Sequence, residues 1–387
     1  MSKTDLIRLG RLIWPAKSKR AGNRNLPILS MTMHFGLIDQ ESKFKKRVAS
    51  ADTSAYKVVA KNQLVVGFPI DEGVLSIQKQ YDEAIVSPAY DVWDVDQTQV
   101  DPIYLEKFLR SPKALSFYSS KLRGSTARRR TLPDDIFLSL QIPICKIEDQ
   151  MHGLDILSKA EELIAGRRQS LDLIDRLIQS HFIDMFGDPA TNPKNWMYGT
   201  LSDVCTQITD GEHQTPKRQS DGVKLLSARN VQDGFLDFSN VDYVDEQEYA
   251  RISKRCDPKL GDILMSCSGS IGRVAPVLTT EPFCLVRSAA LLKPNHEAVD
   301  TSFLVELLRT PYLKSKMLQR ANSSSQANLF QNQIRELPIF QPPLVLQHQF
   351  SNHMERIRHT KSAYQLGLKQ SLALFGSLQS SIFEGPI

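Results

Sequence analysis

The sequence predicts an α+β fold in which two mixed α/β domains repeat one plan, with a pseudo-two-fold relation, and are joined by two long helices that form an antiparallel coiled coil. Three observations carry this prediction. The chain of 387 residues contains an internal repeat with a period near 200 residues, and a heptad pattern occurs twice in the same phase. Between the heptad regions, short apolar runs are broken by Gly, Pro, Asn and Asp, as in strands and turns.

The internal repeat is seen in matched segments that keep the same order. YLEKFLRSP (104–112) returns as FLVELLRTP (303–311), and QLVV (63–66) returns as DILM (262–265), both at a shift of 199 residues. LSMTMHFGLID at 29–39 resembles LSARNVQDGFLD at a shift of 197 to 198. The two halves are therefore expected to share one fold plan.

A heptad pattern follows each of these blocks and predicts two long helices. The apolar positions recur every 3.5 residues, and adding 197 to each heptad position of the first region gives the heptad position of the second. Lys361 and Ser371 occupy two of these positions in the second region. The residues predicted to pair the helices are Leu157, Ile164, Leu171, Ile174 and Ile178 in the first, and Met354, Ile357, Leu368, Phe375 and Leu378 in the second. Neither helix could bury its apolar stripe alone, so we expect the two to pair. The alternative is that each helix packs onto its own domain.

These patterns give four segments. We expect a first recognition domain at 1–146, a long helix at 147–188, a second recognition domain at 189–343 and a second long helix at 344–387. In each domain the pattern predicts mainly strands with one short helix, at 102–110 and at 301–309. The aromatic residues expected in the core of the second domain are Phe235, Phe238 and Tyr243.

Composition narrows the class of protein. Residues 1–146 carry 23 Lys and Arg against 15 Asp and Glu, so the excess positive charge lies in the first domain and favours a polyanionic partner. Five scattered cysteines form no CxxC pair, which argues against a disulfide framework and a zinc site. No apolar run approaches the ~20 residues of a membrane span, and the N-terminus has no signal-peptide pattern. We therefore expect a cytoplasmic protein without a membrane partner.

Motifs for catalysis are missing from the sequence. MSCSGSIGRVAPV (265–277) has the look of a phosphate-binding loop, but it lacks the Gly-Lys-Ser/Thr of a P-loop and continues as a strand. Its Gly272 lies opposite Gly73 at the repeat shift, which favours a tight connection between strands. Glu41-Ser42-Lys43 resembles part of a nuclease site, but no Pro-Asp precedes it, and a solvated turn is the better interpretation. We expect neither catalytic residues nor metal ligands, and twin domains without them favour recognition.

The chain resembles the specificity subunit of type I restriction–modification systems. The segments that carry the resemblance are LSDVCTQITDGEHQTPK (201–217), LLSARNVQDGFLDF (225–238), GDILMSCSGSIGRVAPV (261–277), LLRTP (307–311), LPIFQPPLVLQHQF (337–350) and FIDMFGDPATNPKNW (182–196). The resemblance extends over essentially the whole chain, and it is looser in the first half, where IPICKIEDQ lacks the double proline.

The resemblance implies a DNA-reading subunit without chemistry of its own. Each globular domain would read one half of a bipartite target in double-stranded DNA, and the paired helices would set the spacing and dock two methyltransferase subunits. Those subunits would bring S-adenosylmethionine, and restriction subunits would bring the ATP- and Mg-dependent motor and nuclease. No cofactor is expected on this chain.

Candidate DNA-binding residues were chosen because base edges require directional polar groups and phosphates require positive charge. In the first domain they are Lys17, Lys19, Arg20, Arg24, Lys45, Lys46, Arg128, Arg129 and Arg130. In the second they are Asp210, His213, Gln214, Thr215, Lys217, Arg229, Asn230, Ser268, Ser270, Arg273, Gln326 and Asn328. Two other hypotheses remain open at this point: a DNA-modifying enzyme in its own right, and a twin-domain scaffold that binds protein.

Overall fold

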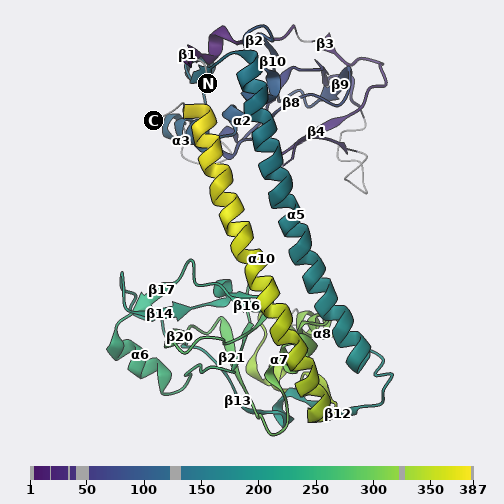
Figure 1. Ribbon diagram of the computed structural model, residues 1–387, viewed down its shortest axis with the longest axis vertical. Coiled ribbons are helices and arrows are strands. Elements are labelled where there is room, and N and C mark those ends of the chain that lie inside the picture. Colours follow the sequence, from purple (N-terminus) through teal and green to yellow (C-terminus); the bar gives the residue numbers. More distant parts are fainter. Residues whose placement is uncertain are drawn as a thin grey trace. The chain divides into compact units, whose positions relative to one another are not determined.

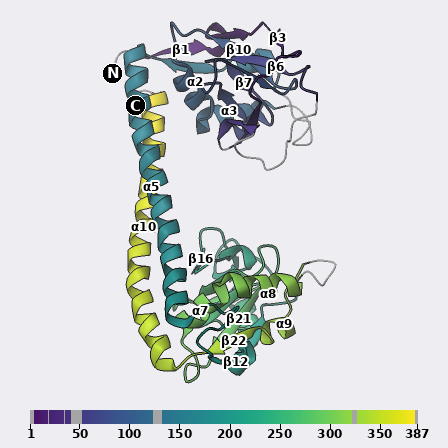
Figure 2. The same cartoon turned by 90° about the vertical axis from the view of Figure 1, so that its right-hand side faces the viewer.

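The computed structural model describes residues 4–17, 19–33, 35–40, 52–122, 132–321 and 327–384. Its contacts divide the chain into two compact units (Figures 1 and 2). Unit 1 consists of Met1–Gly166 and Gly367–Ile387, and unit 2 is Arg167–Leu366. Each unit therefore takes in part of both long helices, α5 (Ile147–Phe186) and α10 (Leu344–Glu384).

Unit 1 is built on a four-stranded sheet of order β2-β10-β7-β8, with a three-stranded sheet β3-β6-β9 and the two-stranded sheets β1-β11 and β4-β5. The strands are β1 (Asp5–Arg8), β2 (Ile13–Pro15), β3 (Lys19–Arg20), β4 (Leu29–Thr32), β5 (Gly36–Asp39), β6 (Lys57–Ala60), β7 (Leu64–Val66), β8 (Leu75–Ile77), β9 (Glu83–Val86), β10 (Asp91–Val95) and β11 (Gln141–Ile144). The helices between them are η1 (Leu9–Arg11), η2 (Ile70–Glu72), α2 (Pro102–Leu109), α3 (Pro112–Lys121) and α4 (Asp134–Leu138).

Unit 2 has the same set of sheets. A four-stranded sheet of order β13-β21-β18-β19 is accompanied by a three-stranded sheet β17-β14-β20 and the two-stranded sheets β12-β22 and β15-β16. The strands are β12 (Met197–Thr200), β13 (Cys205–Asp210), β14 (Val223–Leu226), β15 (Val231–Gln232), β16 (Phe235–Leu236), β17 (Asp242–Val244), β18 (Ile263–Ser266), β19 (Val274–Pro276), β20 (Phe283–Leu285), β21 (Ala289–Pro294) and β22 (Pro338–Gln341). The helices are η4 (Leu201–Asp203), η5 (Ala228–Asn230), α6 (Glu246–Ser253), α7 (Thr301–Arg309), α8 (Pro311–Ala321) and α9 (Gln331–Arg335).

The internal repeat is thus visible in the strand order. The four-stranded sheets match strand for strand, because β2, β10, β7 and β8 stand where β13, β21, β18 and β19 stand. The predicted connection in MSCSGSIGRVAPV is an antiparallel link from β18 to β19, with Met265 opposite Val274. Gly73 and Gly272 both lie in the left-handed region, at φ +71° and +79°, which favours glycine at both repeat positions. The predicted fold class is confirmed.

A buried glutamine opens each long helix in the same way. Gln150 accepts a hydrogen bond from the backbone N–H of Asp101 at 2.9 Å, and Gln347 accepts one from Asp300 at 2.9 Å. Both side-chain amides also donate to backbone carbonyls in the turn just before the helix, at Cys145 and at Pro342. Each glutamine thereby joins the start of a long helix to the residue that caps the N-terminus of α2 or α7.

The prediction of one short helix per domain was wrong. Besides α2 and α7, unit 1 contains α3 and α4, and unit 2 contains α6, α8 and α9. The second helix of each pair begins directly after Ser111 or Thr310, where a proline occupies the first helical position. Ser111-Pro112 and Thr310-Pro311 are start signals that the strand-oriented interpretation overlooked.

The two long helices pack against each other in antiparallel fashion within each unit. In unit 1, a Cβ on Gly153 would contact Ile382 at 3.1 Å. In unit 2, Lys361 donates to Asp175 at 2.5 Å, and His181 lies 2.9 Å from His353. The residue number rises on α5 as it falls on α10, as antiparallel helices require. All ten residues predicted to pair the helices are buried or half-buried.

The long helices also complete the core of each unit. In unit 1, Leu157 of α5 and Phe383 of α10 belong to the cluster formed with Tyr104 and Phe108 of α2. In unit 2, Phe182 and Phe186 of α5 and Phe350 of α10 pack among the rings of Phe303 and Phe340. Helix pairing and packing on a globular domain, which the sequence left as alternatives, therefore occur together.

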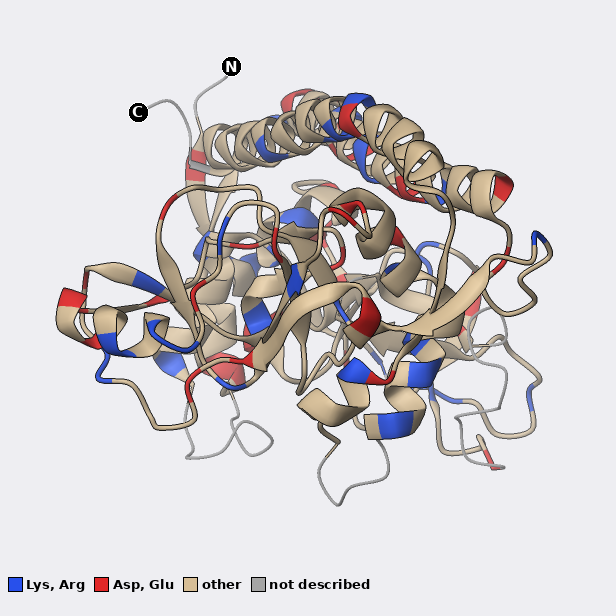
Figure 3. Cartoon of the chain, turned by 90° about the horizontal axis from the view of Figure 1, so that it is seen from below, with Lys and Arg blue, Asp and Glu red and all other residues tan. Residues whose placement is uncertain are grey.

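Charged residues join the globular parts to the helices differently in the two units. In unit 1, Lys107 of α2 forms an ion pair with Glu161 of α5. In unit 2, Glu306 of α7 stands at the repeat position of Lys107, and Arg358 of α10 stands at that of Glu161, so the signs of the two charges are exchanged. Glu306 and Arg358 attract each other. Arg358 also donates to Ser302, one turn before Glu306. Figure 3 shows charges of both signs interspersed along the long helices.

The aromatic residues expected in the core of the second domain differ in how far they are buried. Phe235, expected in the core, is 43 % exposed at the tip of the β15–β16 hairpin, whereas Phe238 packs against a buried cluster and Tyr243 is half-buried. A two-residue link leaves the tip of such a hairpin outside the core, which is why Phe235 escapes burial.

Within the described ranges, no helix has the length and apolar character to cross a membrane.

The histidine pair of unit 2 predicts a loss of stability at low pH. Burial, followed by the neighbouring His353, lowers the pKa of His181 below its ordinary value of 6.5, against a smaller opposing effect of Asp184. The unfolded chain then binds more protons than the folded one. Stability is therefore full above about pH 6.5 and is lost as the pH falls through the lowered pKa. We expect the thermal midpoint of unit 2 to fall between pH 7 and about pH 5, and His181→Asn to fall less over this range. Identical pH profiles for the two proteins would contradict this prediction.

Candidate nucleic-acid interface

One end of the four-stranded sheet of unit 2 collects polar side chains from loops that are distant in sequence. In this antiparallel sheet, the end of β13 lies beside the start of β21, with Asp210 opposite Ala290. The end of β18 lies beside the same start, with Ser266 opposite Ala289, and beside the start of β19. The loops that follow β13 and β18, and those that precede β19 and β21, therefore meet at one edge.

Backbone contacts hold this edge rigidly. The N–H of Glu212 donates to the carbonyl of Leu285 at 2.8 Å, and the N–H of Arg287 donates to the carbonyl of Glu212 at 2.9 Å. The loops approach so closely at Gly211 that a Cβ there would lie 2.4 Å from the Leu285 carbonyl carbon and oxygen. Only glycine fits at this position without backbone movement.

These loops surround a cavity of about 550 Å³. Four of the residues predicted from the sequence line it, namely Asp210, His213, Ser268 and Asn328. Ser268 and Asn328 also form a β-bridge, so the segment after α8 closes one side of the cavity. The other lining residues are Cys267, Arg287, Ser288, Leu329, Phe330, Gln331 and Ile334.

Asp210 supplies a carboxylate that is already held by three donors. The Arg255 guanidinium donates to its Oδ1 at 2.9 Å, the Gln331 amide donates to the same oxygen, and His213 Nε2 lies 2.8 Å from Oδ2. Beside it, burial alone would raise the pKa of Glu212, but hydrogen bonds from the Gln214 backbone and the charge of Arg251 outweigh burial and lower that pKa. Both carboxylates are thus paired with arginines, Asp210 with Arg255 and Glu212 with Arg251.

Two arginines at this edge have unpaired guanidinium groups among the described residues, unlike the other arginines in the globular part of unit 2. Arg218 and Arg229 both pair with Asp242, and Arg251 pairs with Glu212 and Glu248. Among the residues that the structure describes, the guanidinium groups of Arg273 and Arg287 have no ion pair or hydrogen bond. Arg287 is exposed and lines the cavity, whereas Arg273 lies at the start of β19, outside the lining. Positive charge at this edge therefore comes from two unpaired guanidinium groups.

The cavity thiol is predicted to be unreactive. Burial raises the pKa of Cys267 to about 12. At pH 8 its thiolate fraction should be about 10³-fold below that of an ordinary cysteine, and alkylation depends on the thiolate. We expect a maleimide to label Cys267 in native protein about three orders of magnitude more slowly than in urea-unfolded protein, as measured by mass spectrometry of the labelled peptide. Equal rates in the two states would show that the thiol is accessible.

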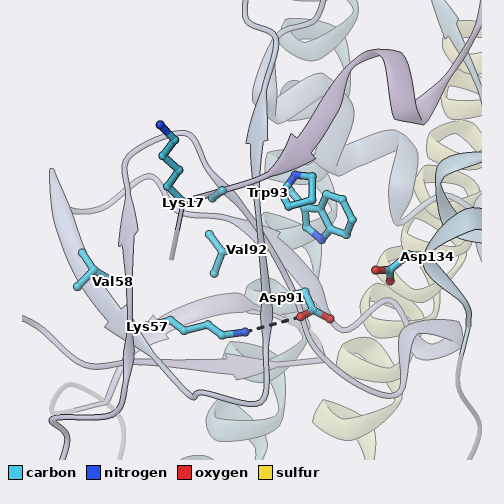
Figure 4. A pocket seen from close by; sticks show the side chains of 9 residues that line it. Lys17, Lys57, Val58, Asp91, Val92, Trp93 and Asp134 are labelled. Carbon is cyan, nitrogen blue, oxygen red and sulfur yellow. Dashed lines mark ion pairs between the residues drawn. The ribbon is translucent and has the colours of Figure 1, made fainter. Parts of the chain in front are cut away.

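Unit 1 has a smaller cavity, of about 170 Å³, which Figure 4 shows from close by. Lys57 reaches Asp91 across it, with Nζ 3.7 Å from Oδ1, while the ammonium group of Lys17 points away from this pair. Trp93 is 4 % exposed, and its indole N–H has no hydrogen-bond acceptor among the described residues. Asp134, at the first residue of α4, also lines this cavity. The polar side chains of this cavity are thus lysines and aspartates, beside a buried tryptophan.

The two cavities occupy equivalent places in the repeated plan. Both lie where the first and second strands of the four-stranded sheet meet, β2 with β10 and β13 with β21. Both are bordered by the short helix before the last strand, where Asp134 of α4 and Gln331 of α9 are repeat partners at a shift of 197. Both linings contain aspartate, but the other polar side chains differ: lysines in unit 1, and arginine, histidine, serines and amides in unit 2.

The remaining predicted residues of the first domain are placed as follows. Lys19 and Arg20 lie exposed on β3, and Arg24 is paired with Glu83 at 2.9 Å. Lys45, Lys46, Arg128, Arg129 and Arg130 lie outside the described residues.

In the second domain, Gln214, Thr215 and Lys217 are exposed on the loop after β13, next to the cavity lining. Ser270 is exposed in the β18–β19 connection, and Gln326 lies outside the described residues. Asn230 is buried at 2 % exposure and donates to the carbonyls of Asp237 and Asn240, so it holds its own loop and does not face a ligand.

Sequence reasoning missed the residue with the freest charge in the cavity, Arg287. A signal existed, because Arg287 is the lone charged residue between the apolar segments 283–286 and 289–292. An arginine that interrupts two buried strands marks the loop between them, and loops at a sheet edge carry function. Gln331 and Ser288 gave no comparable signal. Within the described part of the chain, no three His, Cys, Asp or Glu side chains come together as metal ligands.

The fold and this interface define an internally duplicated class of protein, in which two recognition units share a pair of long helices. Residues 193–372 match the family model described as Type I restriction modification DNA specificity domain. This match covers 180 of the 387 residues, and the resemblance inferred from the sequence is confirmed.

Two curated relatives are also similar to part of this chain. The type I restriction enzyme EcoBI specificity subunit of Escherichia coli is 21 % identical over 193 residues, which are 49 % of this chain and 40 % of the relative. The MjaVIII specificity subunit of Methanocaldococcus jannaschii is 23 % identical over 226 residues, 52 % of this chain and 53 % of the relative. The chain thus spans about half the length of these relatives, or less.

Two solved structures share the fold over nearly the whole chain. The S subunit of a type I restriction–modification system from M. genitalium aligns with a TM-score of 0.56 at 13 % identity, covering 98 % of this chain and 96 % of its own. A chain from a study of complex assembly and conformational transition of the type I R-M system aligns with a TM-score of 0.54 at 15 % identity, covering 99 % and 98 %. Both likenesses support the fold class.

Proposed function

We propose that this chain is the DNA-recognition subunit of a type I restriction–modification complex and performs no chemistry itself. One observation carries the proposal: the same fold plan places a polar cavity at the same sheet edge of each unit, with a different set of side chains in each. Two readers of one plan with different linings suit a target whose two halves have different sequences. The restriction-system relatives are specificity subunits, which supports the same function.

In this proposal the chain works with partners that bring the chemistry. Two methyltransferase subunits would bind S-adenosylmethionine, and restriction subunits would bind ATP and Mg. The target would be bipartite double-stranded DNA, which in a bacterium or archaeon lies in the cytoplasm. The continuous helices α5 and α10, of 40 and 41 residues, would set the distance between the two half-targets.

Two experiments test this function. Sequencing of methylated bases in a host that carries the complete system should yield one bipartite motif, and deletion of this chain alone should abolish it. Purified chain incubated with DNA, Mg and labelled S-adenosylmethionine should show no turnover, because a lone subunit that methylates or cuts DNA would favour the enzyme hypothesis. Binding to DNA should weaken steeply as salt rises, and the absence of any DNA binding would favour a protein-binding scaffold.

The spacing role has its own test. Insertion of one heptad into both α5 and α10, at facing positions, should lengthen the unread spacer of the methylated motif by about 3 base pairs, since seven residues add about 10 Å of helix. Both half-sequences should stay unchanged. A change in either half-sequence would show that the helices do more than separate the readers.

A further inference from the structure

We infer that Arg287 is a specificity-determining residue that reads a guanine in the half-target bound by unit 2. This inference rests on the proposed DNA-reading function and assigns one residue of the cavity to one kind of base. It begins from the observation that Arg287 is the one guanidinium in the lining of that cavity and has no ion pair or hydrogen bond among the described residues.

The backbone of Arg287 is fixed, as direct base reading requires. Its N–H donates to the Glu212 carbonyl at 2.9 Å, and the carbonyl of the next residue, Ser288, accepts from the Cys267 N–H at 2.8 Å. The Ser288 hydroxyl accepts from the Ala228 N–H at 3.0 Å. The residue is thus anchored to β13, β18 and η5 at once. A side chain on such a support loses little freedom when it forms directional hydrogen bonds.

The neighbouring charges of the cavity favour a base edge over a phosphate. Asp210 lines the same cavity, and Glu212 directly precedes His213, which also lines it; the arginines beside these carboxylates, Arg255 and Arg251, are already engaged in ion pairs with them. A phosphate in the cavity would meet these negative charges. The edge of a base pair is neutral and carries both donors and acceptors, which matches a lining of guanidinium, hydroxyl and amide groups.

Guanine is the base that a guanidinium selects. It offers two acceptors, O6 and N7, side by side in the major groove, and a planar guanidinium can donate to both at once. The amides and hydroxyls around Arg287, from Ser268, Ser288 and Asn328, can bond to adjacent groups. None of them carries the charge that makes the arginine–guanine pair the strongest of these contacts.

The test measures base preference rather than affinity alone. The full chain is incubated with a pool of duplex DNA that carries a randomised segment, and bound DNA is sequenced. We expect the wild-type chain to prefer G at one position of one half-target by about 10- to 100-fold over other bases. Arg287→Ala should remove this preference and leave every other position and the other half-target unchanged. Arg287→Lys should retain only part of the preference, since lysine cannot bond with the planar fork.

Arg218→Ala is the matched control, because Arg218 is an exposed arginine of the same unit that is paired with Asp242; it should leave all preferences intact. A uniform loss of affinity in Arg287→Ala, with a salt dependence reduced by about one counterion, would show a phosphate contact and overturn the inference. An unchanged preference would overturn it as well. A wild-type chain without any sequence preference would instead contradict the proposed function. Circular dichroism melting of each variant confirms that loss of preference is not loss of folding.

Discussion

Gly211→Ala should destabilise unit 2 by about 2 to 3 kcal/mol, because the added Cβ would overlap backbone atoms that cannot swing aside. The ideal Cβ position lies 2.4 Å from the carbonyl carbon and oxygen of Leu285 and 2.5 Å from the carbonyl carbon of Val286. Relief of this overlap requires separation of the loop after β13 from the end of β20 and the residue that follows it. The separation would break the hydrogen bond from Glu212 to Leu285 and widen the cavity edge.

Hydrogen exchange of unit 2 peptides measures this effect locally, and DNA selection measures its consequence for reading. Exchange should speed up in 283–292, and preference should weaken at the half-target of unit 2 only. Gly166→Ala is the matched control, because no atom lies within 4 Å of its Cβ position on the exposed face of α5. That change should be neutral or stabilise the helix by about 0.5 to 1 kcal/mol. Equal effects of the two substitutions would contradict the steric account.

Glu306→Ala should cost unit 2 about 3 to 5 kcal/mol, the largest effect expected of any single charge in this chain. Glu306 is 4 % exposed, and its two carboxylate oxygens accept from Arg309 at 2.7 and 2.8 Å. Gln179 of α5 donates to it at 3.1 Å. Removal of the carboxylate leaves the Arg309 guanidinium, 10 % exposed, with a more distant ion pair to Asp175 at 3.6 Å and the charge of Asp233.

Two variants separate the causes. Glu306→Leu combined with Arg309→Met should lose much less stability than Glu306→Ala, because the double variant leaves no buried charge. Asp155→Ala is the control, because it removes an exposed ion pair: Asp155 and Lys159 are 2.6 Å apart, and their side chains are 55 % and 71 % exposed. This change should lower the free energy of unfolding by at most about 0.5 kcal/mol. Urea unfolding followed by hydrogen exchange in α7 provides the measurement. A double variant as unstable as the single one would show that packing, not charge, is what Glu306 supplies.

The parts of the fold that could be predicted are those governed by repetition and by heptad phase. Two heptad patterns at a shift of 197 predicted the long helices. Apolar residues such as Leu157, Ile164, Met354 and Phe375 form a stripe along each helix, and this stripe is buried when the helices pair. The short helices α3, α4, α6, α8 and α9 escaped prediction for a different reason. Their boundaries depend on caps such as Ser111 and Asp245, which are single residues within segments whose composition resembles that of strands.

The site could be predicted only in part, because pairing between charges is a property of three dimensions. Arg229 and Arg287 look alike in the sequence, but the fold pairs the first with Asp242, whereas the second has no ion pair with any residue that the structure describes. Asn230 has an amide side chain of the kind that can read a base, but in the fold this amide donates to the carbonyls of Asp237 and Asn240 in its own loop. Asp210, His213, Ser268 and Asn328 were predicted because their directional polar groups suit base edges, and the fold brings them into one cavity lining.

The opposite arrangement of charge at the two helix contacts bears on how new specificities can arise by exchange of domains. Lys107 faces Glu161 in unit 1, whereas Glu306 faces Arg358 at the same positions of unit 2. A first domain grafted onto the second helix would set Lys107 against Arg358, and a second domain grafted onto the first helix would set Glu306 against Glu161. Each graft would join like charges beside a packed core, which destabilises the contact. We therefore expect each domain to keep a favourable helix contact only in its own position in the chain, so that the two domains cannot simply trade places.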